Sequence, residues 1–248
     1  MRFLILIFAL STFTGWSQRN LKDSSVATVV FAPHYKFNLT GGDLNKLWGF
    51  NHQVGLDVGV KLKNNLYLGL DGGFIFGNQL KDSSMFNNVY TSNGTITGFA
   101  GNPAIVLFMM RGMSTHFDLG FVWNKFGTNP NSGLWLKFGG GYMMHKIRIE
   151  SQLDDVPQLE GEYRKGYDRL TMGFSTKQFI GYLHQTDSRF LNFYAGLEFV
   201  QGFNKNVRTY NFDLGGPDDE LKFDMLYSVK VGWLIPIYKR TTQEFYFD

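Results

Sequence analysis

Apolar and polar residues alternate strictly along most of the chain. Between Gln53 and Leu62, Val and Leu occupy every second position, and Gln, Gly, Asp and Lys lie between them. A period of two puts each set on its own face of a β-strand, whereas a helix would mix them. The segment from Leu66 repeats the pattern after a polar Lys-Asn-Asn turn, so the two segments predict a hairpin.

Six further segments alternate in the same way. They begin near Val29, Phe117, Leu134, Leu170, Leu191 and Phe223. In the segment from Leu170, polar residues at Thr176 and Gln178 interrupt the apolar face, and we expect a bulge there or an exit from an apolar environment. The pattern predicts an all-β protein with about eight antiparallel strands.

A ninth apolar segment, residues 104–110, does not alternate. If it is left out of the sheet, the short connections 63–65, 128–132 and 185–188 fall at one end. The long connections 40–49, 78–114, 151–165 and 204–220 then fall at the other end. Bacterial transmembrane barrels have an even strand number, short periplasmic turns and longer outer loops. We therefore predict an up-and-down barrel with periplasmic termini and four outer loops, the second of which contains residues 104–110.

The composition indicates which face meets which environment. Aromatic residues make up 17% of the chain and there are 29 Gly, yet the mean hydropathy is only -0.16. No run of about 18 apolar residues is present, so membrane-spanning helices are excluded. Alternating strands explain why the chain is rich in aromatic residues and yet polar on average, because one face of each strand meets lipid and the other lines a polar lumen. Aromatic residues near the predicted strand ends suggest interfacial girdles: Phe37, Trp48, Phe76, Trp123, Trp135, Phe203, Trp233 and Tyr238.

The N-terminus has the features of an export signal. Met1-Arg2 precedes an apolar stretch from Phe3 to Leu10, and small residues flank Trp16 before Gln18. We predict a signal peptide over residues 1–17 and a single barrel domain over residues 18–248. The net charge of +3 is scattered among acidic residues, which argues against a nucleic-acid partner, and the chain has no cysteine to carry a lipid or a disulfide.

The lumen face carries many ionisable residues. The predicted polar network comprises His34, Asp57, Lys61, Asp71, His116, Asp118, Lys137, Glu198, Asp224 and Lys230. An eight-stranded barrel is just wide enough for side chains to fill, and unpaired buried charge is costly, so we expect acids and bases to pair and to plug the lumen. A narrow ion path through the same charges is the alternative.

Candidate chemistry is weak. His116 and Asp118 lie two apart on one face, which could orient an imidazole, but no nucleophile stands at a matching spacing. His34, His116 and His145 come from different strands at uncertain heights, and the acidic loop residues Asp213, Asp218, Asp219 and Glu220 lack EF-hand spacing. We expect no catalytic residue, no metal and no cofactor.

The chain from residue 18 onward resembles the small OmpA-like eight-stranded outer-membrane barrels, through its alternation and its sorting of loops. Segments 129–133, 145–149 and 166–170 also look like uncharacterised outer-membrane barrels of Bacteroidetes-type bacteria. The resemblance implies an outer-membrane location and carries over no catalytic residue. Unlike OmpA-type proteins, this sequence shows no periplasmic peptidoglycan-binding domain.

These observations favour a non-enzymatic barrel that contacts outer-membrane lipid and other outer-membrane proteins. The leading hypothesis is a structural or accessory subunit of an assembly for protein export or envelope biogenesis. The alternatives are a small pore and an outer-membrane enzyme acting on lipid or protein. The apolar segment in the second outer loop has two interpretations. It could extend the barrel as a strand pair or fold over its mouth. Alternatively, it could dock a partner through Ile105, Leu107, Phe108, Met109 and Met110.

Overall fold

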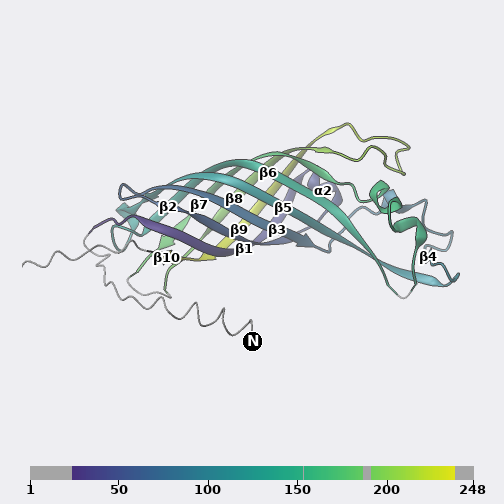
Figure 1. The fold of residues 1–248 in the computed structure, drawn as a ribbon, viewed down its shortest axis with the longest axis horizontal. Coiled ribbons are helices and arrows are strands. Elements are labelled where there is room, and N and C mark those ends of the chain that lie inside the picture. Colours follow the sequence, from purple (N-terminus) through teal and green to yellow (C-terminus); the bar gives the residue numbers. More distant parts are fainter. Residues whose placement is uncertain (1–23, 153, 187–190, 238–248) are drawn as a thin grey trace, which may run out of the picture.

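Eight antiparallel strands close into a barrel in the computed structural model, which describes residues 24–152, 154–186 and 191–237 (Figure 1). Each strand pairs with the next along the chain, and β9 pairs with β1 to close the sheet. The wall strands are β1 (Thr28–Gly42), β2 (Asn51–Lys61), β3 (Leu66–Gly77), β5 (Pro103–Trp123), β6 (Gly133–Gln152), β7 (Thr171–His184), β8 (Phe193–Asn206) and β9 (Leu221–Trp233). The predicted up-and-down barrel is confirmed, while the predicted signal peptide lies outside the described residues.

Two short strands accompany the wall. β10 (Ile235–Ile237) follows β9 and pairs with the start of β1, and β4 (Ile96–Thr97) pairs with the outer end of β5. Among the described residues, no helix is long and apolar enough to cross a membrane.

The hydrogen-bond register fixes the tilt of the strands. A path of directly paired residues that starts at Val30 returns to β1 ten residues further on, through Gly59, Gly69, Asp118, Gly139, Lys177, Val200, Leu226 and Thr40. A shear of ten over eight strands corresponds to a tilt of about 40°.

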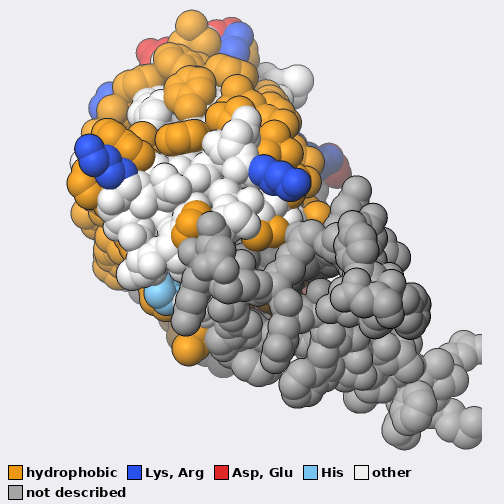
Figure 2. All heavy atoms as spheres, turned by 90° about the vertical axis from the view of Figure 1, so that its left-hand side faces the viewer, with side chains coloured by type: hydrophobic (Ala, Val, Ile, Leu, Met, Phe, Trp, Pro, Cys, Tyr) orange, Lys and Arg blue, Asp and Glu red, His pale blue; other side chains and the backbone are white. Residues whose placement is uncertain are grey.

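An apolar belt surrounds the barrel. On each wall strand, mostly apolar side chains occupy six successive outward positions, as from Met113 to Trp123 on β5 and from Leu134 to Met144 on β6. Ten residues of strand span about 33 Å, which at this tilt gives a height of about 25 Å, the thickness of the apolar band of outer-membrane barrels. Figure 2 looks onto the end with the short turns, where apolar side chains rim the described surface.

The girdle prediction is only partly right. Trp123, Phe203 and Trp233 are exposed near the belt edges, but Trp48 and Trp135 are each 1% exposed and point into the interior. Tyr238 lies outside the described residues.

The second outer loop is shorter than predicted, because residues 104–110 belong to β5. They pair with β6 from Ile105 opposite Gln152 to Met110 opposite Ile147, so β5 and β6 extend beyond the belt as a two-stranded ribbon. The long outer connections lie at this end, whereas the short turns lie at the other.

The predicted bulge in β7 is absent. Thr171 to His184 pair without interruption with β8, and Thr171 to Leu183 pair likewise with β6. Thr176 and Gln178 point outward, and their polarity is satisfied by Gln201 on β8. The two glutamine amides bond to each other at 3.0 and 2.9 Å, and the Thr176 hydroxyl donates to Gln201 Oε1 at 2.8 Å.

An apolar core lies at the outer mouth of the barrel. The short helix α2 (Leu44–Leu47) and the 3-10 turns η1 (Ser84–Phe86), η3 (Pro157–Leu159) and η4 (Tyr163–Gly166) belong to the outer loops. Buried side chains from these loops meet others from the strand ends, among them Leu44, Trp48, Phe86, Ile75, Met110, Met143, Leu159, Val200 and Leu226. We call this layer the cap. The remaining 3-10 turn, η2 (Asn124–Phe126), lies at the opposite end.

Candidate functional site

Four carboxylates and four ammonium groups form one buried cluster in the middle of the lumen. The carboxylates belong to Asp57, Asp71, Asp118 and Glu198, and the ammonium groups belong to Lys36, Lys137, Lys177 and Lys230. All eight residues are at most 3% exposed. The four negative and four positive charges of this cluster cancel. Lys36 and Lys177, which the alternation also puts on the lumen face, belong to this cluster.

The cluster is densely connected. Lys177 Nζ lies 2.8 Å from both Asp71 and Asp118, and Lys36 Nζ lies 2.6 Å from Glu198. Lys230 bridges Asp57 at 3.0 Å, Glu198 at 3.3 Å and also Asp71. Because each carboxylate contacts more than one cation, the desolvation cost of each charge is offset by several partners.

An aromatic box covers one side of this cluster. Lys137 Nζ lies 3.1 Å from Asp57 Oδ1 and also 4.3 Å from the centroid of the Trp135 ring. Tyr67 and Tyr194 meet Trp135 edge to face, each with ring centroids 5.1 Å away, and Phe179 completes the box. The rings narrow the lumen and stabilise the ammonium group by cation–π attraction.

Separate polar groups lie at the two ends of the lumen. Toward the periplasmic end, Lys61 donates to Asn131 Oδ1 and to the Val26 carbonyl, both at 3.1 Å. Toward the outer end, Asp224 accepts from Asn204 Nδ2 at 2.6 Å and contacts His145 Nε2 at 2.9 Å. The predicted network is therefore divided into three groups at different heights, and the ionisable side chains of all three groups are buried.

The geometry does not favour catalysis at His116. Its Nε2 lies 2.9 Å from Ser175 Oγ, a contact between β5 and β7 that the sequence spacing could not reveal. Asp118 is held by Lys177 and gives His116 no orienting contact in the described structure. Ser175 and His116 are at most 1% exposed, so a substrate could not reach them without opening the barrel.

The carboxylates that could bind a metal ion are paired with cationic side chains. His34, Asp57 and Asp71 bring three potential ligand atoms within 4.8 Å of one another, but Lys230 contacts both carboxylates and already supplies a positive charge there. In the last outer loop, Asp213 and Asp218 pair with Arg169, and Asp219 pairs with Lys205 at 2.9 Å. These donor sets therefore act as ion-pair partners.

The ribbon divides the predicted partner segment between two faces. Phe108 and Met110 point into the cap, where Phe108 stacks on Phe86 with ring centroids 4.0 Å apart and Met110 is 1% exposed. Ile105, Leu107 and Met109 point outward, and the first two are 51% and 38% exposed. The segment contributes to its own core and also presents an apolar outer face.

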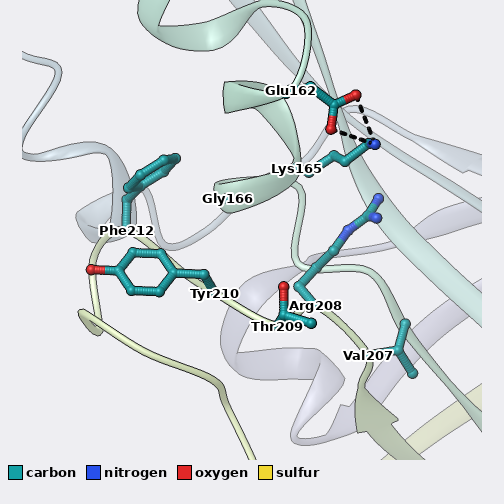
Figure 3. Close-up of a pocket in the computed structure, with 8 residues that line it drawn as sticks. All are labelled: Glu162, Lys165, Gly166, Val207, Arg208, Thr209, Tyr210 and Phe212. Atoms are coloured by element: carbon teal, nitrogen blue, oxygen red, sulfur yellow. Dashed lines mark hydrogen bonds and ion pairs between the residues drawn. The ribbon is translucent and has the colours of Figure 1, made fainter.

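The outer loops also form a shallow cleft, drawn in Figure 3. It has a volume of about 300 Å³ and is lined by residues of η4 and of the last outer loop, including Lys165, Arg208, Tyr210 and Phe212. Its charges are paired within the chain, since Lys165 bonds to Glu162 and Arg208 binds Asp168 through two nitrogens. Hydrogen bonding to Asp168 raises the pKa of Arg208.

No family model and no curated protein sequence matches this chain. Solved structures do resemble it. Ail of Yersinia pestis in complex with sucrose octasulfate aligns at 10% identity with a TM-score of 0.46, covering 84% of this chain and 99% of that one. The N-terminal barrel of Pseudomonas aeruginosa OprF aligns at 12% identity with a TM-score of 0.35, over 82% and 96% of the two chains. P. aeruginosa OprG aligns at 8% identity with a TM-score of 0.37, over 89% and 100%.

These neighbours include a β-barrel domain, that of OprF, and an outer-membrane protein, OprG. The likeness to barrels of Bacteroidetes-type bacteria stays a prediction. The closed barrel, its belt about 25 Å high and its polar lumen make this chain an integral β-barrel of the bacterial outer membrane.

Proposed function

We propose that the protein is a non-conducting, non-enzymatic barrel that serves as a structural or accessory subunit of an outer-membrane assembly. The observation that carries the proposal is the filled lumen, in which a neutral cluster of eight charged residues lies between the apolar cap and the Lys61 group. A barrel whose lumen is closed to solutes would act through its outer surface and its loops. Protein export and envelope biogenesis are the processes in which such a subunit would serve.

The outward face of the ribbon is the surface that we assign to partner contact. Ile105 and Leu107 are exposed on the protein surface. Because they stand beyond the belt, the hydrocarbon of the membrane does not reach them. Met109 beside them offers an adaptable apolar contact. Exposed apolar surface in such a position is typical of protein contact sites.

The competing pore is tested by planar-bilayer recording of the purified barrel, with a reconstituted porin as a positive control. We expect no steady unitary conductance, because the cluster leaves no continuous water path. Steady single channels that shift their ion selectivity in a Lys177→Gln variant would establish the pore reading and refute the plug.

The contact surface is tested by placing a photo-reactive amino acid at Leu107 in living cells, with Tyr163 on η4, which is even more exposed, as the control position. We expect one discrete cross-linked product from Leu107 and none from Tyr163. The double variant Ile105→Ser, Leu107→Ser should abolish co-purification of that product's partner while the barrel still inserts. Equal labelling at both positions, or an unchanged yield of partner with the double variant, would contradict the assignment.

A further inference from the structure

Three cationic side chains gather on the outward face of β5 and β6, immediately above the apolar belt. Arg111 and Lys146 lie directly opposite each other in the register, and Arg148 lies two residues further along β6, opposite Met109. Lys146 and Arg148 are exposed and Arg111 is half-buried. We call these three residues the basic cluster.

Like charges placed directly across two strands repel each other. Within the described chain, the compensation is small. Arg148 Nη2 lies 3.3 Å from Glu150 Oε2, in a pair that is about half exposed. Arg111 donates to the Met110 carbonyl at 2.7 Å, and no described acid forms an ion pair with it or with Lys146. The basic cluster therefore has an uncompensated positive charge.

The height of the basic cluster suggests what compensates it. The belt ends at Met113 on β5 and Met144 on β6, and residues 111 and 146 are the next outward positions. Two residues of strand at this tilt rise about 5 Å, which places both cations in the headgroup layer, directly above the hydrocarbon. On β1, β2, β7 and β9 the corresponding positions are the uncharged Gly41, Phe50, Leu170 and Leu221. On β8 the corresponding residue is Lys205, whose ammonium group pairs with Asp219 at 2.9 Å, so the positive charge without an acidic partner lies on β5 and β6.

We propose that Arg111, Lys146 and Arg148 bind a phosphate group of a lipid in the outer leaflet. The guanidinium groups suit phosphate because they can donate two parallel hydrogen bonds to its oxygens, and Lys146 adds a point charge between them. The acyl chains of the same lipid would lie along Met113, Tyr142 and Met144 in the belt below. The occupant is a phosphorylated glycolipid headgroup anchored by its chains, and not a free anion.

The test compares binding of bisphosphorylated lipid A and of enzymatically dephosphorylated lipid A to the full-length barrel in mixed detergent micelles, followed by native mass spectrometry. The variant Arg111→Gln, Lys146→Gln, Arg148→Gln removes three charges. The matched control, Lys63→Gln, Lys125→Gln, Lys165→Gln, removes three exposed charges elsewhere. We expect the cluster variant to bind lipid A at least about tenfold more weakly, while the control stays within about twofold. Dephosphorylated lipid should bind the unchanged protein at least about tenfold more weakly.

Resistance of the unheated protein to SDS shows that each variant is folded. If the triple variant fails this check, Lys146→Gln alone replaces it, with an expected loss of about threefold and a weaker dependence of affinity on salt. Equal affinity for both lipids, or an unchanged affinity in the cluster variant, would overturn the proposal. Displacement of lipid A by about 10 mM inorganic phosphate would also overturn it, because the site would then bind the free anion without the lipid.

Discussion

Individual residues of the lumen are constrained from several strands at once. Asp57 contacts Lys137 and Lys230 and accepts a hydrogen bond from Tyr194, three residues on three different strands. A substitution of Asp57 disturbs a network of charges and not a single pair. The loss in free energy of unfolding should therefore depend on which partner charges are left unpaired.

Replacement of Asp57 by Asn should destabilise the barrel by about 3–5 kcal/mol, because it leaves an uncompensated buried cation. The double variant Asp57→Asn, Lys137→Gln restores neutrality and should be less destabilised than the sum of its single changes. Urea unfolding in lipid vesicles measures both free energies. Asp155→Asn, at an exposed loop position, is the control. Additive effects in the double variant would show that the cluster is not electrostatically coupled.

A glycine of the lumen should also be sensitive to substitution, for steric reasons. A Cβ on Gly55 would lie 2.3 Å from the Gly72 carbonyl oxygen and 2.6 Å from His34 Nε2, whereas a Cβ on the outward Gly72 meets nothing within 4 Å. We expect Gly55→Ala to lower the free energy of unfolding by about 1–3 kcal/mol through crowding. Gly72→Ala on the adjacent strand should have little effect. Similar losses for the two variants would mean that the faces are assigned wrongly.

A charged substitution tests which face of the strands meets lipid. Leu56 lies near the middle of the belt on β2, and Leu56→Arg should cost about 2–4 kcal/mol, since the guanidinium would face hydrocarbon. The control Leu56→Ile keeps the apolar surface. Folding titrations into vesicles provide the measurement, and a tolerated arginine would contradict the lipid-facing assignment.

At the scale of elements, the ribbon is where strand alternation serves two purposes. Its inner face completes the cap and its outer face remains free, so neighbouring residues in the sequence should respond differently to substitution.

Phe108→Ala should loosen the cap, because it removes the ring that stacks on Phe86. We expect a local loss of about 2–3 kcal/mol, seen as faster hydrogen exchange in residues 78–102, while the amides of the barrel strands stay protected. Leu107→Ala, one residue away on the outer face, should leave the exchange unchanged. The opposite result would mean that the ribbon has the reverse orientation.

At the scale of the whole molecule, the two ends of the barrel differ. The end with short turns carries the Lys61 group, and the end with long loops carries the cap, the ribbon and the basic cluster. The loop lengths assign the second end to the cell surface.

Labelling of intact cells checks this orientation. Cysteine at the exposed positions Asp155 or Asp219 should react with a membrane-impermeant maleimide, and cysteine at Asn64 in the β2–β3 turn should react only after the cells are permeabilised. The chain has no natural cysteine, so the background is clean. Labelling of Asn64→Cys alone on intact cells would reverse the topology.

The sequence by itself determined the number of wall strands and the face to which most of their residues belong. Lipid and lumen impose opposite demands on successive side chains of one strand, so the evidence is local and can be read without knowing the neighbours. The same locality explains the errors. Residues 104–110 do not alternate because the cap and the outer face of the ribbon both accept apolar side chains, and the pattern therefore hid the outer part of β5.

The tertiary structure alone decided which polar residues meet. Lys36 reaches Glu198 across 162 residues of sequence, and His116 reaches Ser175, because the shear of ten sets the heights of residues from distant strands. It also placed Trp48 and Trp135 inside, where the cap and the lumen need large rings, and put Arg111 opposite Lys146. The register between strands is a property of the closed sheet, so it cannot be inferred from the sequence of any one strand.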